Sequence, residues 1–192
     1  MPDAIVVGNG GHAISIIDIL FELNYRILGT IKPTDGENNT ICGIDTIGTD
    51  LDLPKLRKKI DFAFNGIGQI KDHLPRKNVY EKLLTLDFKI PPLISPSANI
   101  SKHVNIGLGT SVHAQSFINA QTFIGDNCII NSGSIIEHGC IIEKNTHIST
   151  GVILNGNVKI GKNCFIGSGS ILYQDSEVLD NVIIPAGSII KN

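Results

Sequence analysis

The second half of the chain repeats one pattern at an interval of six residues. From Ile100 to Ile190, every sixth residue is Ile, Val or Leu, sixteen times in succession and without an insertion. Four residues after each of the first fifteen stands Val, Thr, Ser or Cys. A period of six fits neither a continuous helix nor a lone strand. It is typical of a hexapeptide-repeat β-helix, in which each hexad forms one flat face and stacked coils bury a continuous column.

The first half follows another pattern, of alternating strands and helices. The run AIVVG (Ala4 to Gly8) predicts a buried parallel strand, and the next residues predict a Gly-rich turn and a helix with apolar residues at helical spacing. Further strands are expected at YRILGTI and DFAFNGIG, a helix at VYEKLLTL, and an exit strand and linker at FKIPPLISP. We therefore expect a small Rossmann-like α/β domain over residues 1–95 and a β-helix over residues 96–192.

Composition narrows the classes of function. The net charge is −2 with no basic block, which speaks against a nucleic-acid partner. The N-terminus does not look like a signal peptide, and no apolar stretch approaches a membrane span, so no membrane partner is expected. The four cysteines lack C-x-x-C spacing, which favours reduced thiols and a cytoplasmic setting. No metal site is evident.

Hexads such as IGDNCI, IGKNCF and IGSGSI resemble those of the left-handed β-helix acyltransferases, in which three hexads form one triangular coil. The left-handed sense comes from this resemblance alone. A narrower likeness joins VVGNGGHA to IIEHGCIIEKNTHISTGVILNGNVKIGKNCFIGSGS. The two together are similar to the sugar O- and N-acetyltransferases of bacterial surface-glycan pathways. The resemblance implies acetyl-CoA as co-substrate, a nucleotide-sugar substrate, and a homotrimer with its active sites between adjacent β-helices.

The resemblance assigns the catalytic base to His138, which stands in HGCII where the family has its catalytic histidine. His138 is the third residue of its hexad and is expected to point outward. It would take a proton from the acceptor amine or hydroxyl and return it to the leaving thiolate. Without the resemblance, an outward histidine in a solenoid is an ordinary solvated residue.

One position departs from the family pattern. The residue after the base is usually Glu or Asp, which orients the imidazole, and here it is Gly139. Glu137 or Glu143 could substitute, although Glu137 is expected on the opposite side of the strand from His138. The sequence therefore predicts a slower enzyme or a different orienting group.

By the same resemblance, His147 and the backbone N–H of Gly156 would contact the acetyl carbonyl as an oxyanion-type site. Asn131 matches a polar residue near the acceptor, or is an ordinary turn residue. Small residues 18 apart would let the pantetheine of CoA approach the backbone, although hexapeptide repeats use small residues widely. These residues are Thr150, Ser168 and Ala186.

The turn GNGGHA (Gly8 to Ala13) follows a strand and opens a helix, as phosphate-binding turns do. It lacks the third glycine of G-x-G-x-x-G, and Lys32 stands where a ribose-binding acid is usual, which argues against a dehydrogenase. By resemblance, the turn holds the nucleotide of the sugar nucleotide. The residues assigned to this role are Gly10, Gly11, His12, Lys32 and Gly66. The alternative is a tight turn with a surface lysine.

The hexad pattern also indicates roles for cysteines and aromatic residues. Three cysteines occupy the small-residue position and are interpreted as core residues rather than nucleophiles: Cys128, Cys140 and Cys164. Four apolar residues are expected to point outward and to form the trimer interface: Phe117, Phe123, Ile130 and Phe165.

The leading hypothesis is an acetyl-CoA-dependent N-acetyltransferase acting on a nucleotide-linked amino-deoxy-sugar. The alternative within the enzyme class is O-acetylation of a sialic-acid-like sugar. From another class, Gly139 favours a catalytically weak homologue that only binds a ligand. Ice binding would need a regular Thr array on one face, and the outward positions are mixed.

Overall fold

The computed structural model describes residues 1–38 and 40–191 of the chain. It divides into two compact units, one formed by Met1–Gly68 and Leu74–Ile90, the other by Gln69–His73 and Pro91–Asn192. In the described residues, no helix is long and apolar enough to cross a membrane.

The first unit is a five-stranded sheet in the order β3-β4-β2-β1-β5, parallel except for β3. Its strands are β1 (Asp3–Val7), β2 (Arg26–Lys32), β3 (Thr40–Ile41), β4 (Ile44–Thr49) and β5 (Phe62–Asn65). Its helices are α1 (Gly11–Glu22), α2 (Leu53–Arg57) and α3 (Leu74–Thr85). The predicted Rossmann-like α/β architecture is confirmed.

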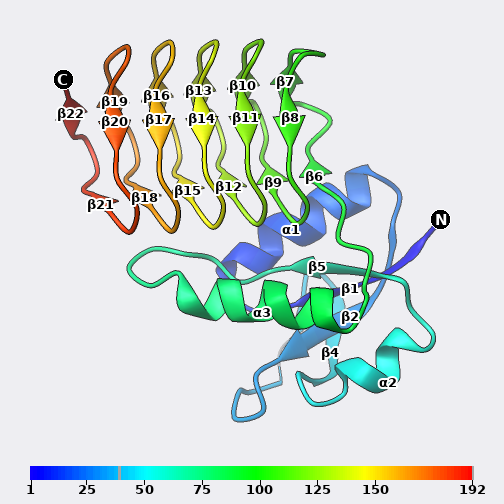
Figure 1. Ribbon diagram of the computed structural model, residues 1–192. Coiled ribbons are helices and arrows are strands. Elements are labelled where there is room, and N and C mark those ends of the chain that lie inside the picture. Colours follow the sequence, from blue (N-terminus) through cyan, green and yellow to red (C-terminus); the bar gives the residue numbers. More distant parts are fainter. Residues whose placement is uncertain (39, 192) are drawn as a thin grey trace. The chain divides into compact units, whose positions relative to one another are not determined.

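The helices of this unit cover both faces of the sheet (Figure 1). Helix α1 packs its apolar stripe on the face that carries Val6, because a Cβ built at Gly66 would meet both Val6 and Ala13. Helix α3 packs on the other face, where Tyr80 and Leu83 cluster with Ile5 and other residues of the sheet. Sequence reasoning did not predict the hairpin of β3 and β4. Strand β3 has only two residues, and the two isoleucines of β4 are separated by Asp45 and Thr46, which does not give an alternating pattern.

The second unit is a β-helix of two-residue strands that form three parallel sheets along its axis (Figure 1). The first sheet contains β7 (Asn99–Ile100), β10 (Phe117–Ile118), β13 (Ile135–Ile136), β16 (Ile153–Leu154), β19 (Ile171–Leu172) and β22 (Ile189–Ile190). The second contains β8 (Asn105–Ile106), β11 (Phe123–Ile124), β14 (Ile141–Ile142), β17 (Lys159–Ile160) and β20 (Glu177–Val178). The third contains β6 (Leu93–Ile94), β9 (Ser111–Val112), β12 (Ile129–Ile130), β15 (His147–Ile148), β18 (Phe165–Ile166) and β21 (Ile183–Ile184).

Each coil turns its corners with a residue in the left-handed region of φ. Among the described residues these positions recur every six residues from Gly109 to Gly187, and they are occupied by Gly, Asn, Asp or Gln. Such residues are the ones that tolerate positive φ best. At one corner the asparagines also stack: Asn127, Asn145, Asn163 and Asn181 pass side-chain hydrogen bonds from coil to coil at 2.9–3.2 Å.

The interior of the β-helix is the predicted column of aliphatic side chains, which is fully buried through its central coils. The small-residue position is buried as well, and its thiols and hydroxyls donate to backbone carbonyls 15 residues further on. Cys140, for example, donates to the carbonyl of Asn155 at 3.2 Å, and Thr146 to that of Gly161 at 2.8 Å. Cys128, Cys140 and Cys164 are thus core residues.

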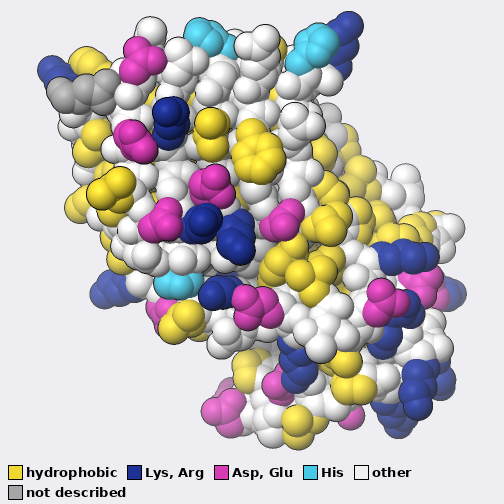
Figure 2. Space-filling view, viewed as in Figure 1, with side chains coloured by type: hydrophobic (Ala, Val, Ile, Leu, Met, Phe, Trp, Pro, Cys, Tyr) yellow, Lys and Arg dark blue, Asp and Glu magenta, His cyan; other side chains and the backbone are white. Residues whose placement is uncertain are grey.

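The three outward surfaces of the β-helix differ. The first sheet presents an apolar row, which we call the isoleucine face: Phe117, Ile135, Ile153, Ile171 and Ile189. The second presents Phe123, Ile141, Lys159 and Glu177, which we call the mixed face. The third presents Ser111, Ile129, His147, Phe165 and Ile183, which we call the histidine face. Figure 2 shows one side of the molecule, where hydrophobic, acidic and basic side chains lie intermingled over the β-helix.

The prediction that Ile130 points outward is wrong. Its side chain is completely buried in the β-helix core, because Ile130 is itself the aliphatic residue of its hexad. Side chains alternate along a strand, so its neighbour Ile129 takes the outward position on β12.

Candidate active site

His138 lies in the turn that joins β13 to β14, with its side chain exposed. The imidazole rests against the backbone of Gly156, one coil further on. A Cβ built at Gly156 would come within 2.8 Å of Cε1 and 2.9 Å of Nε2 of His138. A residue with a side chain at position 156 would therefore displace the ring of His138. In the described part of the chain, neither the ring of His138 nor the N–H of Gly156 makes a hydrogen bond, so both can serve a ligand.

Gly139 occupies a left-handed corner, with φ at +70°. The space beside it is filled by the next coil, because a Cβ at this position would lie 2.4 Å from Oδ1 of Asn157. Asn157 in turn donates through Nδ2 to Oδ1 of Asp175 at 3.1 Å. The Asn157 amide therefore fills the space that a side chain at position 139 would enter.

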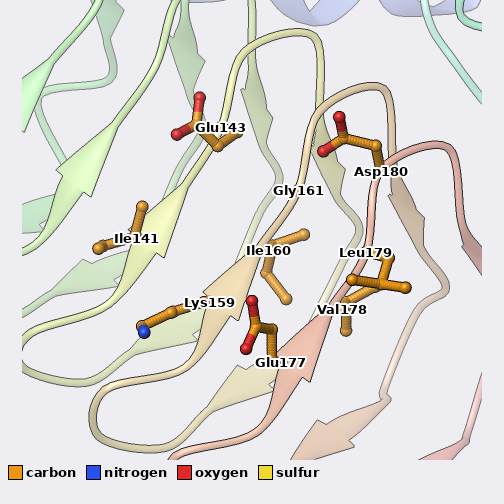
Figure 3. Close-up of a pocket in the computed structure, with 9 residues that line it drawn as sticks. All are labelled: Ile141, Glu143, Lys159, Ile160, Gly161, Glu177, Val178, Leu179 and Asp180. Carbon is orange, nitrogen blue, oxygen red and sulfur yellow. The ribbon is translucent and has the colours of Figure 1, made fainter.

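Neither suggested substitute for the carboxylate of the family pattern hydrogen-bonds His138 in the described part of the chain. Glu137 accepts a hydrogen bond from Nδ2 of Asn119 at 2.8 Å, in the column of side chains that neighbours that of His138. Glu143 stands at the far end of β14. It lines a separate hollow of the mixed face together with Lys159, Glu177 and Asp180 (Figure 3).

His147 lies on the histidine face and is buried, with 6% of its surface exposed. Its Nδ1 is 2.5 Å from the carbonyl oxygen of Gln69, and its Nε2 is 3.4 Å from Nδ2 of Asn131. The ring of Phe165 stands edge-on to it, with centroids 5.2 Å apart. Sequence reasoning singled out Asn131 and His147 but gave no sign of Gln69, which is 78 residues distant in the chain.

The predicted residues of the β-helix thus form two groups within one chain. His138 and Gly156 share the corner between the first and second sheets, whereas Asn131 and His147 belong to the third sheet and its exit turn. In a triangular coil that corner is opposite the third sheet. The predicted pairing of His147 with Gly156 around one acetyl group therefore does not occur inside a single chain.

The predicted small-residue column lies at the corner between the third and first sheets. Thr150, Ser168 and Ala186 are all exposed there. Ser168 hydrogen-bonds Ser149 at 2.8 Å, which ties the column to the turn that follows His147. The column runs parallel to the β-helix axis and leaves the backbone accessible.

The N-terminal residues that were assigned to nucleotide binding lie at the carboxyl ends of three neighbouring strands: Gly10, Gly11 and His12 after β1, Lys32 at the end of β2, and Gly66 after β5. Strands β1 and β5 are adjacent, and the chain leaves β1 through α1 towards β2 on one side while β5 pairs with β1 on the other. Open α/β sheets bind ligands at the carboxyl ends of their strands. Gly10 is the N-cap of the twelve-residue helix α1, and a Cβ at Gly10 or Gly11 would meet nothing within 4 Å. The first turn of α1 is therefore accessible from outside, with its N–H groups available to an anion.

A cavity of about 220 Å³ adjoins this turn, lined by apolar residues together with Gly8, Lys32 and Asp50. The ammonium of Lys32 donates to the carbonyl of Gly36. The Thr34 hydroxyl and, with it, Lys82 hold the pKa of Asp50 below its usual range, so this carboxylate is ionised. Asp50 follows β4, which the prediction missed, and it places a carboxylate in the lining of this cavity.

Gly66 lies against the framework, because Val6 and Ala13 fill the space that a side chain would need. The loop after it is shaped from inside by Arg76, which is fully buried. The Arg76 guanidinium donates to the carbonyls of Asn65 at 3.1 Å and Ile67 at 2.7 Å. The sequence did not indicate that Arg76 is buried, because it is one of several charged residues on a polar helix.

Two family models match the chain. The model described as the PglD N-terminal domain matches residues 3–83, and the model described as bacterial transferase hexapeptide (six repeats) matches residues 121–156 and 157–192. A comparison with curated protein sequences found no match.

Solved structures resemble the chain over almost its whole length. One is a variant of perosamine N-acetyltransferase from Caulobacter crescentus in complex with CoA and GDP-perosamine. It has a TM-score of 0.93 and 28% identity, covering 100% of this chain and 90% of that one. The chain belongs to the left-handed β-helix sugar acetyltransferases. The family therefore also confirms the expected left-handed sense of the β-helix.

Other structures of the comparison agree with this family. The acetyltransferase domain of PglB from Neisseria gonorrhoeae FA1090 in complex with acetyl coenzyme A has a TM-score of 0.90 and 28% identity, covering 98% of this chain and 90% of that one. WeeI from Acinetobacter baumannii AYE is 16% identical with a TM-score of 0.54, covering 95% of this chain and 96% of that one, and shows the fold alone.

Proposed function

We propose that this protein transfers the acetyl group of acetyl-CoA to the amino group of a nucleotide-linked amino-deoxy-sugar. The observation that carries the proposal is the match of both halves of the chain, in order, to an N-acetyltransferase bound to CoA and a GDP-linked sugar. A cytoplasmic setting is part of the proposal, because the cysteines of the described chain are all free thiols.

In this proposal His138 is the general base. Its imidazole accepts a proton from the sugar amine as the nitrogen attacks the thioester carbonyl, and it returns the proton to the sulfur when the C–S bond breaks. Gly156, beside the ring, has a backbone N–H that can donate to the developing oxyanion. Among residues 1–38 and 40–191, no carboxylate hydrogen-bonds the ring of His138, so in this proposal its orientation depends on packing against Gly156 and on the substrates themselves.

The nucleotide would occupy the first unit. The diphosphate would meet the N-terminus of α1 at Gly10, Gly11 and His12, and the remaining part of the nucleotide would meet the cavity beside Lys32. An ionised Asp50 favours donors such as hydroxyl or amide groups over phosphate at that end of the cavity. Gly66 contributes by letting α1 pack closely on the sheet.

We further propose that the protein acts as a homotrimer with the isoleucine face turned towards the threefold axis. This face is bounded on one side by the corner of His138 and on the other by the corner of Thr150, Ser168 and Ala186. Threefold symmetry around it would bring the first corner of one copy to the second corner of the next. His138 would then approach Asn131 and His147 of a neighbour, with CoA along the small-residue column.

The test is the release of free CoA thiol from acetyl-CoA with a panel of acceptors. The panel contains GDP- and UDP-linked 4-amino-sugars, together with free and nucleotide-linked sialic acids to detect O-acetylation. Turnover on an amino-sugar nucleotide is expected, and His138→Ala should lower kcat by about 10²–10⁴-fold, the usual contribution of a general base.

The matched control is His103→Ala, an exposed histidine at the same edge of the β-helix two coils earlier. It should keep wild-type turnover. Acetylation confined to sialic acids would assign oxygen rather than nitrogen as the acceptor. Silence with every acceptor, in a folded protein that still binds acetyl-CoA, would show that the amino-sugar assignment is wrong.

A further inference from the structure

The segment Gln69–His73 belongs to the β-helix unit and is fastened to its histidine face by one side chain. The amide Nε2 of Gln69 donates to two backbone carbonyls, those of Asn145 and Cys164, each at 3.0 Å. These carbonyls belong to successive coils, and the Gln69 side chain is buried, with 4% of the residue exposed. Both N–H donors of one amide group are thus used, which fixes the position of the Gln69 backbone.

The carbonyl of Gln69, held in this way, determines that Nδ1 of His147 carries a hydrogen. A carbonyl oxygen can only accept, so the contact of 2.5 Å requires that Nδ1 of His147 carries the hydrogen. In the neutral imidazole Nε2 then carries a lone pair. Asn131 has its Oδ1 engaged by the N–H of Ser132 at 2.8 Å, so its Nδ2 is the atom that faces Nε2.

We infer that Gln69 is a positioning residue that holds His147 as the Nδ1–H tautomer and, through it, aims the side-chain amide of Asn131. This inference rests on the proposed acetyl transfer. A neutral His147 in this tautomer cannot donate to the thioester oxygen. Nδ2 of Asn131 gives one hydrogen to His147 and has a second for a ligand, so Asn131 is the side chain that donates to the acetyl carbonyl.

The first test reads the tautomer directly. Long-range ¹H–¹⁵N correlation spectra of the labelled full-length protein, assigned by loss of the signals in His147→Gln, distinguish a protonated nitrogen from one with a lone pair. Nδ1 should be the protonated nitrogen at a pH where the ring is neutral. Protonation at Nε2 in the wild-type protein would overturn the inference.

The second test removes the anchor. Gln69→Glu keeps the length of the side chain but loses both N–H donors, and Gln69→Ala removes the side chain. Each should shift His147 towards the Nε2–H tautomer and lower kcat about tenfold or more with little change in KM for the acceptor. Lys71→Ala, an exposed residue of the same segment, is the matched control and should change neither quantity.

An unchanged tautomer and an unchanged kcat in both Gln69 variants would refute the positioning role. The spectra do not depend on turnover. A wild-type protein that shows the Nδ1–H tautomer and yet acetylates none of the acceptors would leave the role of Gln69 intact and refute the proposed function instead.

Discussion

At the scale of single residues, Gly139 shows how the fold limits the chemistry beside the candidate base. The corner requires a positive φ, and the side chain of Asn157 fills the space that a larger residue would take. A glycine here is explained by the β-helix alone. A carboxylate at position 139 would need a different residue at 157, so the two positions have to be considered together.

We predict that Gly139→Ala destabilises the protein by about 2 kcal/mol. About 1 kcal/mol comes from an L-residue with positive φ, and about 1 kcal/mol from displacing Asn157 and its hydrogen bond to Asp175. The matched control is Gly133→Ala, because Gly133 has a similar φ of +66° but nothing within 4 Å of its Cβ position. Urea unfolding should show a smaller loss of unfolding free energy for Gly133→Ala. Equal losses in the two variants would mean that displacing the Asn157 side chain has no energetic cost.

The two histidines show what sequence can and cannot reveal about a site. The outward direction of His138 could be predicted from the hexad register, since the register fixes which way each residue points. The surroundings of His147 could not be predicted, because they depend on the Gln69 amide, whose contacts cross 76 and 95 residues of chain. The hexad repeat of the sequence contains no information on a contact between residues so far apart in the chain.

At the scale of elements, the hexad explains why the β-helix was so readily predicted and the first unit less so. Each hexad buries one aliphatic and one small side chain, so a register error would place a polar residue in the core. Strands β3 and β4 have no such constraint. No residue of β4 is fully buried and β3 has only two residues, and a hydrogen bond between Thr40 and Asp45 joins them. Ile130 was misplaced outward although its own hexad had already placed it inward.

The small-residue position leads to a prediction about alkaline stability. Burial raises the pKa of the Cys140 thiol from 9.0 to about 11. The unfolded chain then loses the thiol proton at a lower pH than the folded chain does. The stability that this group contributes is complete below about pH 9 and declines as the pH rises towards 11, by at most about 3 kcal/mol in total.

Urea unfolding between pH 8 and 10.5 measures this loss. Cys140→Ala should give a flatter dependence on pH than the wild-type protein, whatever its stability at neutral pH. Cys42→Ala, at an exposed thiol, should leave the wild-type dependence unchanged. Burial also raises the pKa of Cys164, so part of the decline should remain in Cys140→Ala.

At the scale of the whole molecule, the isoleucine face is the feature that most needs a partner. Ile135 and Ile189 are 38% and 59% exposed, and they belong to one straight row of apolar side chains. The mixed face carries lysine and glutamate in the corresponding row and suits contact with water. This contrast between two faces of one solenoid is the structural basis for the proposed trimer.

We predict that Ile153→Glu produces a monomer without acetyltransferase activity, because three carboxylates would be buried near the threefold axis at a cost of several kcal/mol each. Light scattering gives the mass, and thiol release gives the activity. Lys159→Glu places a glutamate on the mixed face and should keep both the mass and the activity. A fully active monomer would contradict the intersubunit site.

Because three hexads complete one coil of the β-helix, the face on which a residue lies depends on its position within a repeat of eighteen residues. Loss or gain of six residues after His138 would rotate every later column by one face, so that the position of His147 would fall on the isoleucine or the mixed surface. Loss or gain of eighteen would only shorten or lengthen the axis by one coil, with each column, the asparagine stack included, still in line. Length changes in this half of the chain are therefore compatible with its chemistry only in whole coils, or as loops that leave and re-enter at the same corner.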